Sequence, residues 1–190
     1  MSGKGWGQTA IVSNSGTICA GADVTLFETG GDAVSWLWST NGSATFSSTT
    51  EQNPIASGAV NGESFTVVIT DINSNTASAT TIVMVNALPV VTFITQPGAS
   101  TCIGVNVTYS TQASMSNYVW SFPGTIPPDY TILSGGDATS NTVTVKYLTA
   151  GIRTVNINYK TTSGCSAVLA TSSTATTINP LPTTSAIYHQ

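Results

Sequence analysis

The chain has 190 residues, of which 41% are apolar and only 6% are charged, and its net charge is −4. This length suffices for two β-sandwich domains of ordinary size, and the charged share is about a quarter of the usual one. The four basic side chains are Lys4, Lys146, Arg153 and Lys160, so the sequence lacks the basic patch that nucleic-acid binding requires. No apolar run approaches the length of a membrane span.

The first predicted module occupies residues 10–86. Residues 1–9 precede it as a flexible lead or as the remnant of a signal peptide, because Gly5-Trp6-Gly7 matches a small-x-small cleavage pattern. Threonine and valine dominate the apolar-rich segments, which favours strands over helices, and turn signals such as Asn41-Gly42 separate them. We expect the strands, in chain order, at residues 10–13, 23–28, 33–39, 44–47, 64–70 and 76–85.

Two proline-containing segments delimit the second module. The first is Asn86-Ala87-Leu88-Pro89 and the second is Asn179-Pro180-Leu181-Pro182. Proline cannot donate to a β-ladder and restricts φ, so both segments are expected to be short, semi-rigid linkers. The chain therefore divides into a linker at 87–89, a second module at 90–179, and a further linker with the start of a truncated next module at 180–190.

The second module repeats features of the first. Cys102-Ile103-Gly104 corresponds to Cys19-Ala20-Gly21, and Gly164-Cys165 corresponds to Ser74-Asn75, so an asparagine replaces one cysteine in the first module. One long strand is expected to begin at Gly151 and to run through the alternating residues Val155, Ile157 and Tyr159.

Each module has one aromatic-x-Trp-Ser stretch, at Trp36-Leu37-Trp38-Ser39 and at Tyr118-Val119-Trp120-Ser121. Side chains two residues apart on a strand share a face, so Trp36 and Trp38 point one way, as do Tyr118 and Trp120. A large aromatic residue in the middle of a β-sandwich is a usual core filler. We therefore predict an all-β fold of two tandem immunoglobulin-like sandwiches arranged head to tail, with these four aromatic residues in the cores.

The sequence offers no recognisable catalytic machinery. Its one histidine is His189, in the C-terminal tail, whereas an activated serine or cysteine nucleophile needs a base that folded structure holds in place. The eight acidic residues fall into no recognisable pair or motif. We therefore expect a protein that is not an enzyme and has no cofactor.

One loop invites a metal-binding interpretation. Asp71-Ile72-Asn73-Ser74-Asn75 places oxygen ligands at alternate positions, as the start of an EF-hand does. The sixth position is Thr76 instead of glycine, however, and the twelfth is Ile82 instead of glutamate. Hairpin turns rich in asparagine and aspartate give the same letters for backbone reasons, so we predict a turn and no metal site.

The chain has three cysteines, Cys19, Cys102 and Cys165. Cys102 precedes its second strand and Cys165 follows a late one, which places them at opposite ends of the module, roughly 20 Å apart along a strand of about seven residues. A disulfide needs Cα atoms within about 7 Å, which excludes a bond between Cys102 and Cys165. Cys19 precedes the second strand of the first module and is expected at the end of that module that faces the second. Cys19 and Cys165 are therefore the better candidates, across the junction between modules. Cys102 would then await a partner in a further module. The alternative is three free thiols, with Cys19 and Cys102 packing as small apolar residues.

These motifs resemble a known class of module. The second module resembles a PKD-like domain at Tyr118–Pro123, Ser134–Gly136, Asn141–Val145 and Gly164-Cys165, and the first resembles its companion type at Cys19–Gly21, Trp38-Ser39, Asn53-Pro54 and Val68–Asn73. Such modules, joined by Pro-Leu-Pro linkers, recur in very long cell-surface proteins of the Bacteroidota that type IX secretion exports, among them gliding-motility adhesins. The second module lacks the Asp-Phe-Gly-Asp-Gly run of the parent PKD family, so the resemblance implies no PKD ligand.

The resemblance implies a non-catalytic structural and adhesive segment of a large secreted bacterial protein, located outside the cell, with neighbouring modules of the same chain as its partners. The alternative is a carbohydrate-binding accessory module of a secreted polysaccharide-degrading enzyme, with a surface polysaccharide as its partner. Trp6 and Tyr130 are the aromatic residues outside the predicted core that could stack on sugars. The competing interpretation places Trp6 in a tail and packs Tyr130 beneath the loop that makes the second module longer.

Overall fold

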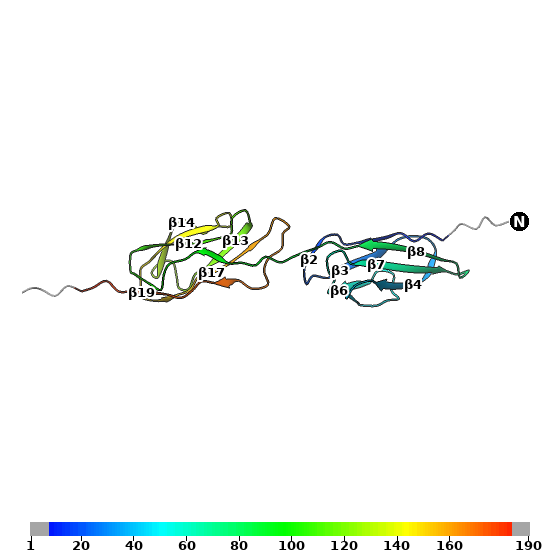
Figure 1. Ribbon diagram of the computed structural model, residues 1–190, viewed down its shortest axis with the longest axis horizontal. Helices are drawn as coiled ribbons and strands as arrows, with labels where there is room; N and C mark the ends of the chain where they lie inside the picture. The colour runs from blue at the N-terminus through cyan, green and yellow to red at the C-terminus, as the bar shows by residue number, and fades with distance from the viewer. Residues whose placement is uncertain (1–7, 184–190) are drawn as a thin grey trace, which may run out of the picture. The chain divides into compact units, whose positions relative to one another are not determined.

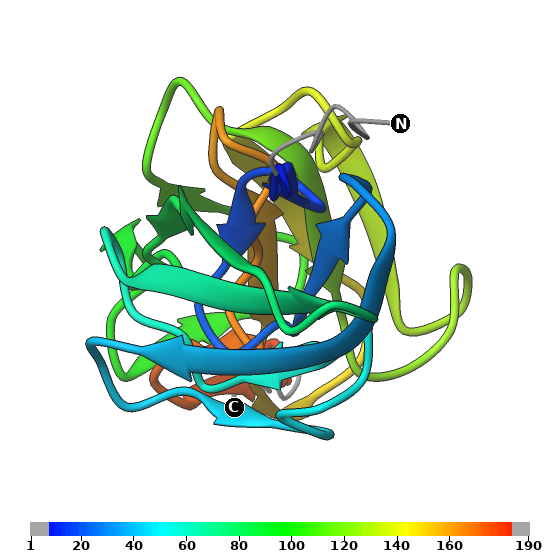
Figure 2. The same ribbon diagram turned by 90° about the vertical axis from the view of Figure 1, so that its right-hand side faces the viewer.

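A computed structural model describes residues 8–183 of the chain. Over these residues every regular element is a β-strand, and Figures 1 and 2 show strands and connecting loops in both halves. These residues form two compact units, module 1 up to Ala87 and module 2 from Leu88 onward. The predicted all-β fold of two tandem immunoglobulin-like sandwiches is confirmed. Within the described residues, no helix is both long and apolar enough to cross a membrane.

Module 1 consists of two sheets and one short parallel pair. One sheet has the order β1-β3-β6-β5, the other has the order β4-β7-β8, and β2 pairs in parallel with β9. Figure 2 shows β7 alongside β4. The strands are β1 (Val12–Asn14), β2 (Ile18–Cys19), β3 (Val24–Glu28), β4 (Ala33–Thr40), β5 (Thr45–Phe46), β6 (Ile55–Ser57), β7 (Ser64–Asp71), β8 (Thr76–Ile82) and β9 (Val85–Asn86).

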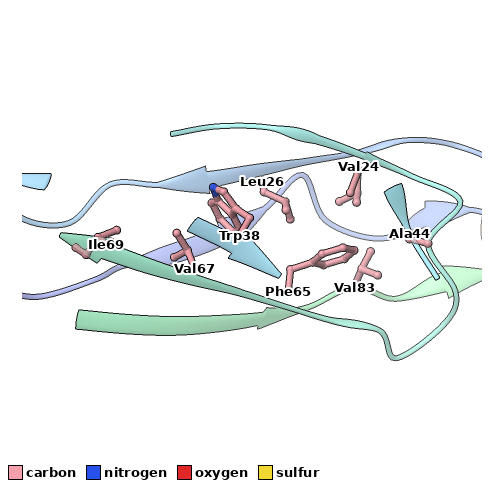
Figure 3. Close-up of a cluster of buried hydrophobic side chains, with 10 residues drawn as sticks. Val24, Leu26, Trp38, Ala44, Phe65, Val67, Ile69 and Val83 are labelled. Carbon is pink, nitrogen blue, oxygen red and sulfur yellow. The ribbon is translucent and has the colours of Figure 1, made fainter. Parts of the chain in front are cut away.

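The core of module 1 lies between these two sheets and follows from alternation along the strands. Val24 and Leu26 on β3 are fully buried, and so are the inward side chains of β7, namely Phe65, Val67 and Ile69. Figure 3 shows the two sets pointing toward each other, with Trp38 among them. Each such side chain contributes about 1.5–3 kcal/mol by its removal from water, so this period-two pattern fixes which face of each strand is inward.

Module 2 repeats the plan with three small sheets. Their orders are β10-β12-β15-β14, β13-β17-β18 and β11-β19-β16. The strands are β10 (Phe93–Thr95), β11 (Ser100–Cys102), β12 (Asn106–Thr111), β13 (Ser116–Ser121), β14 (Tyr130–Gly135), β15 (Thr142–Tyr147), β16 (Gly151–Arg153), β17 (Asn156–Lys160), β18 (Thr171–Ser172) and β19 (Thr176–Asn179).

Aromatic residues fill much of the core of module 2. Tyr109 and Tyr147 are fully buried and their hydroxyl oxygens lie 3.1 Å apart, so each phenol finds its polar partner inside the core. Phe93 and Trp120 pack against both buried clusters of the module, and their ring centroids are 6.2 Å apart. Edge-on ring pairs of this kind add to the stabilisation from burial alone.

The strand predicted to begin at Gly151 proves to be two strands. β16 pairs with β19, whereas β17 pairs with β13 and β18. The change of partner occurs at Val155, whose N–H donates to Ser173 Oγ at 3.0 Å and whose carbonyl accepts the Ser173 N–H at 2.8 Å. Ser173 thus provides hydrogen-bond partners for the backbone N–H and carbonyl of Val155 where the strand pairing is interrupted. The alternation of apolar residues continues across this point, so it did not predict the break.

Candidate functional site

The predicted core aromatic residues lie in or against the two cores. Trp38 is 2% exposed and Tyr118 is 4% exposed. Trp36 and Trp120 are half-buried and pack against the buried clusters of their own modules. These rings are therefore placed to stabilise the sandwiches, and those of Trp38 and Tyr118 are not open as binding platforms.

The indole N–H of the central tryptophan donates to a backbone carbonyl in both modules. Trp38 Nε1 donates to the carbonyl of Glu51 at 2.9 Å, and Trp120 Nε1 donates to the carbonyl of Ser140 at 2.9 Å. In each module the segment carrying that carbonyl also accepts a strand N–H, from Trp38 to Thr49 and from Tyr118 to Ala138. Each indole therefore connects its strand to the loop segment that carries the accepting carbonyl.

Glu28 is a buried carboxylate, 1% exposed, that organises the N-terminal end of module 1. Its Oε1 accepts the N–H groups of Gly30 at 2.7 Å and Ile11 at 3.3 Å, and its Oε2 accepts Trp36 Nε1–H at 3.1 Å. A buried carboxylate is tolerated when donors of this kind surround it. The Glu28 carboxylate therefore stabilises the fold through these hydrogen bonds.

Glu63 plays the matching role elsewhere in module 1 and is 2% exposed. Its Oε1 accepts Thr40 Oγ1–H at 2.5 Å and the Ala44 N–H at 2.9 Å, and its Oε2 accepts the Val60 N–H at 2.9 Å. Burial by itself raises the pKa of this carboxyl, but the three hydrogen bonds together outweigh burial and hold its pKa below the ordinary value. A Cβ at Gly42 would collide with this carboxyl, so the loop requires glycine there.

The loop proposed above as a turn rather than a metal site is a self-contained hairpin. Asp71 Oδ1 accepts the N–H groups of Asn73 and Asn75, both at 2.8 Å, and Oδ2 accepts Asn75 Nδ2–H at 2.8 Å. The bond from the Asn75 side chain contributes most to lowering the pKa of Asp71. In the part of the chain that the structure describes, no three histidine, cysteine, aspartate or glutamate side chains come close enough together to hold a metal ion.

Asp129 and Arg153 form an ion pair in module 2, with 3.5 Å between Asp129 Oδ1 and Arg153 Nη2. Thr149 lies between them, because its hydroxyl donates to Asp129 Oδ1 at 2.9 Å and accepts from Arg153 Nη2 at 2.5 Å. The guanidinium also lies 5.8 Å from the centroid of the Tyr147 ring. These contacts attach the longer loop of module 2 to its core.

Tyr130 is 6% exposed and packs against Phe122 and Tyr147, with ring centroids 5.3 and 6.4 Å away. It is therefore a core residue and cannot stack on a sugar, so the alternative that packs it beneath the loop is correct. Trp6, the other candidate sugar platform, lies outside the described residues. No pocket is found in the described part of either module.

The three cysteines are not equivalent. Cys19 and Cys165 are disulfide-bonded, whereas Cys102 is a half-buried free cysteine. The alternative of three free thiols is therefore wrong, and a Cys102–Cys165 bridge inside module 2 is not formed. Pairing of Cys19 with Cys165 remains our prediction.

Comparisons with known proteins show a likeness of fold alone. No family model and no curated protein matches the chain. Among solved structures the chain is similar to the fibronectin(III)-like modules of Clostridium thermocellum CbhA, at 14% identity over 95% of this chain and 100% of that one, with a TM-score of 0.42. It is also similar to the D00-D0 domain of Intimin, at 15% identity over 88% and 99% with a TM-score of 0.38. For the insect immune protein hemolin the identity is 12%, the coverage 95% and 49%, and the TM-score 0.41.

Proposed function

We propose that this chain is a non-catalytic structural and adhesive repeat segment of a large secreted bacterial cell-surface protein. The observation that carries the proposal is that both modules end in the same way. Cys19 lies beside Asn86 in one module and Cys102 lies beside Asn179 in the other, each on a short parallel pair that leads into a proline-containing linker. Modules with a repeated end are suited to being joined in series.

The chemistry of the polar side chains supports a structural role. Glu28 and Glu63 accept backbone N–H groups inside module 1, and Asp71 closes a hairpin. Disulfide-bonded cysteines are typical of proteins exported to an oxidising environment, which supports an extracellular location. Export by type IX secretion and a role in gliding adhesion, within the Bacteroidota, belong to the same proposal and rest on the motif resemblance.

Immunoblotting and cell-surface labelling test this function. An antibody against residues 1–190 should detect, in a reducing gel of the source organism, a band far larger than the 19.5 kDa of this chain. It should also label intact cells, and external protease should remove the label while leaving a cytosolic marker intact. Labelling that requires permeabilised cells would contradict the proposal.

A second candidate function, carbohydrate binding, is favoured by one surface. The outward face of the β4-β7-β8 sheet carries no charged side chain. It combines hydroxyl groups with exposed aliphatic side chains, among them Leu37, Val68 and Ile82, which are 58%, 36% and 60% exposed. Three rows of this face cross all three strands, namely Ser35, Thr70 and Thr76; Leu37, Val68 and Ser78; and Ser39, Thr66 and Thr80, and a fourth pairs Ser64 with Ile82. Hydroxyl and aliphatic groups together suit the hydroxyl rim and apolar face of an uncharged sugar.

A glycan array decides this second candidate. Selective binding by the chain that Leu37→Asp abolishes would favour the accessory-module function. Ile55→Asp is the matched control, because Ile55 is 43% exposed and lies on β6, a strand of the other sheet of module 1. An array without selective binding leaves the structural and adhesive proposal as the account of the chain.

A further inference from the structure

The free Cys102 occupies the backbone position in module 2 that the bonded Cys19 occupies in module 1. Cys19 is in register with Asn86 and Cys102 with Asn179, both in parallel pairs. The next N–H donates to the same partner in each module, from Ala20 to Asn86 at 2.8 Å and from Ile103 to Asn179 at 2.9 Å. The two cysteine carbonyls accept from the residue three positions later in both modules.

The glycine two residues after each cysteine completes this equivalence. Gly21 and Gly104 both adopt a φ of 84°, a left-handed conformation that glycine accommodates without strain. The tight turn Cys-x-Gly-x therefore presents the two sulfur positions in the same local setting. The difference between them is chemical, because Cys19 is disulfide-bonded and Cys102 is free.

Cys165 has its own counterpart in module 1, which is Asn75. The Thr161 N–H donates to the Cys165 carbonyl at 2.9 Å, as the Asp71 N–H donates to the Asn75 carbonyl at 3.0 Å. The residue before each is left-handed, Gly164 with a φ of 83° and Ser74 with a φ of 66°. The same hairpin therefore carries a cysteine in module 2 and an asparagine in module 1.

The two cysteine positions of module 2 lie at opposite ends of that module. Cys102 is beside Asn179, the last residue of the last strand. The hairpin of Cys165 follows β17, whose Tyr159 donates its hydroxyl to the carbonyl of Val90, at the beginning of the module, at 3.4 Å. A module of this type thus has one cysteine position at its C-terminal end and one at its N-terminal end.

We propose that Cys102 is the site of a disulfide to a further module of this type, one that carries a cysteine at the hairpin position of Cys165, by the same pairing of positions that we predict for Cys19 and Cys165. This inference rests on the proposed function of a serial repeat. The partner of Cys102 is a hairpin whose last two residues are glycine and cysteine. Because module 1 has an asparagine, Asn75, at this hairpin position, it cannot form such a bond.

The bond requires an oxidant. Two thiols form one S–S bond and release two protons and two electrons, and a disulfide of the glutathione class accepts these to become two thiols. The Cys102 thiolate attacks one sulfur of that oxidant, and the thiolate of the second module then displaces the remaining thiol from the mixed disulfide. Tethering the two modules in one chain raises the effective concentration of the second thiol to the millimolar range, about what a short linker provides.

Extending the full chain by one module tests the proposal. The chain through Pro182 is followed directly by a second copy of residues 90–182, which recreates the natural junction after a proline, and the product is refolded with oxidised and reduced glutathione. Non-reducing peptide mapping should find Cys102 of the original module joined to the added copy's counterpart of Cys165. One thiol, the added copy's counterpart of Cys102, should remain alkylatable. Full alkylation of the original Cys102 in the folded protein overturns the proposal, and so does a disulfide dimer joined through two Cys102 residues.

The chain supplies its own matched control. When the added module is instead a copy of residues 10–89, which has Asn75 in the hairpin, Cys102 should stay alkylatable, and Asn75→Cys in that copy should restore the bridge. A bridge that forms equally with Asn75 and with Asn75→Cys would show that the hairpin position is irrelevant, and it overturns the assignment. These results do not depend on cellular location. Surface labelling that fails therefore counts against the proposed function, whereas an original Cys102 that stays alkylatable beside the added copy of residues 90–182 counts against this inference.

Discussion

Replacing Glu63 by glutamine tests whether a buried anion anchors module 1. The substitution preserves the size of the side chain, and its remaining oxygen can still accept from Thr40 and Ala44. The new amide NH₂ then faces the N–H of Val60. Because both groups are hydrogen-bond donors, the Val60 N–H is left without an acceptor. An N–H that donates to a carboxylate and is then left unpaired costs about 2–3 kcal/mol, a substantial part of the stability of a single domain.

Hydrogen exchange of the β7 amides reports the opening of module 1 separately from module 2. Glu63→Gln should accelerate this exchange by about 30- to 150-fold, because every 1.4 kcal/mol corresponds to a factor of ten. Glu51→Gln, which removes the charge of an exposed carboxylate on the same module, is the control and should leave the exchange rates near those of wild type.

The pH dependence follows from the direction of the pKa shift. The hydrogen bonds to Glu63 lower its pKa in the folded state against the burial that raises it, so the carboxylate stabilises module 1 fully above the ordinary value of 4.5 and loses this contribution as the pH falls below it. The stability difference between wild type and Glu63→Gln should therefore be constant above pH 4.5 and shrink below it. Equal stability of the two proteins above pH 4.5 would refute the anchoring role.

Three further predictions concern the cores and the arrangement of the modules. Trp38→Ala and Trp120→Ala should each cost about 3–5 kcal/mol in thermal or urea unfolding of their own module, and unchanged unfolding would show that the rings are not core residues. Burial raises the pKa of Tyr109 and of Tyr147 above the ordinary value of 10, so the stability of module 2 should be constant up to pH 10 and fall above it. Phenolate absorbance should then appear together with unfolding. Ionisation of both phenols near pH 10 in the folded protein would contradict this. Small-angle scattering should give an elongated particle for a head-to-tail arrangement, whereas a compact particle would contradict that arrangement.

Alternation of apolar residues predicted the long strands because burial on one face leaves a period of two. The expected segments 33–39 and 64–70 correspond closely to β4 and β7, whose inward residues form the core. The short strand β6 escaped prediction because Asn53-Pro54 directly before it indicates a break. Its three residues depend on pairing with β3 and β5, which are distant in sequence.

The two buried glutamates show a signal that was present and not used. Glu28 continues the inward series of Val24 and Leu26, and Glu63 begins the inward series that continues at Phe65. An acidic residue in phase with the core predicts a buried carboxylate with hydrogen-bond donors around it. Which donors surround it depends on loops, such as the one containing Ala44, that the pattern of one strand cannot place.

Non-reducing peptide mapping of the intact chain tests the central claim, that the modules are built to be joined through cysteines at their ends. The native protein is alkylated before denaturation and then digested without reductant. We predict a single disulfide-linked peptide pair that contains Cys19 and Cys165, with Cys102 recovered in alkylated form. A linked pair containing Cys102 and Cys165, or three alkylated cysteines, would contradict the claim.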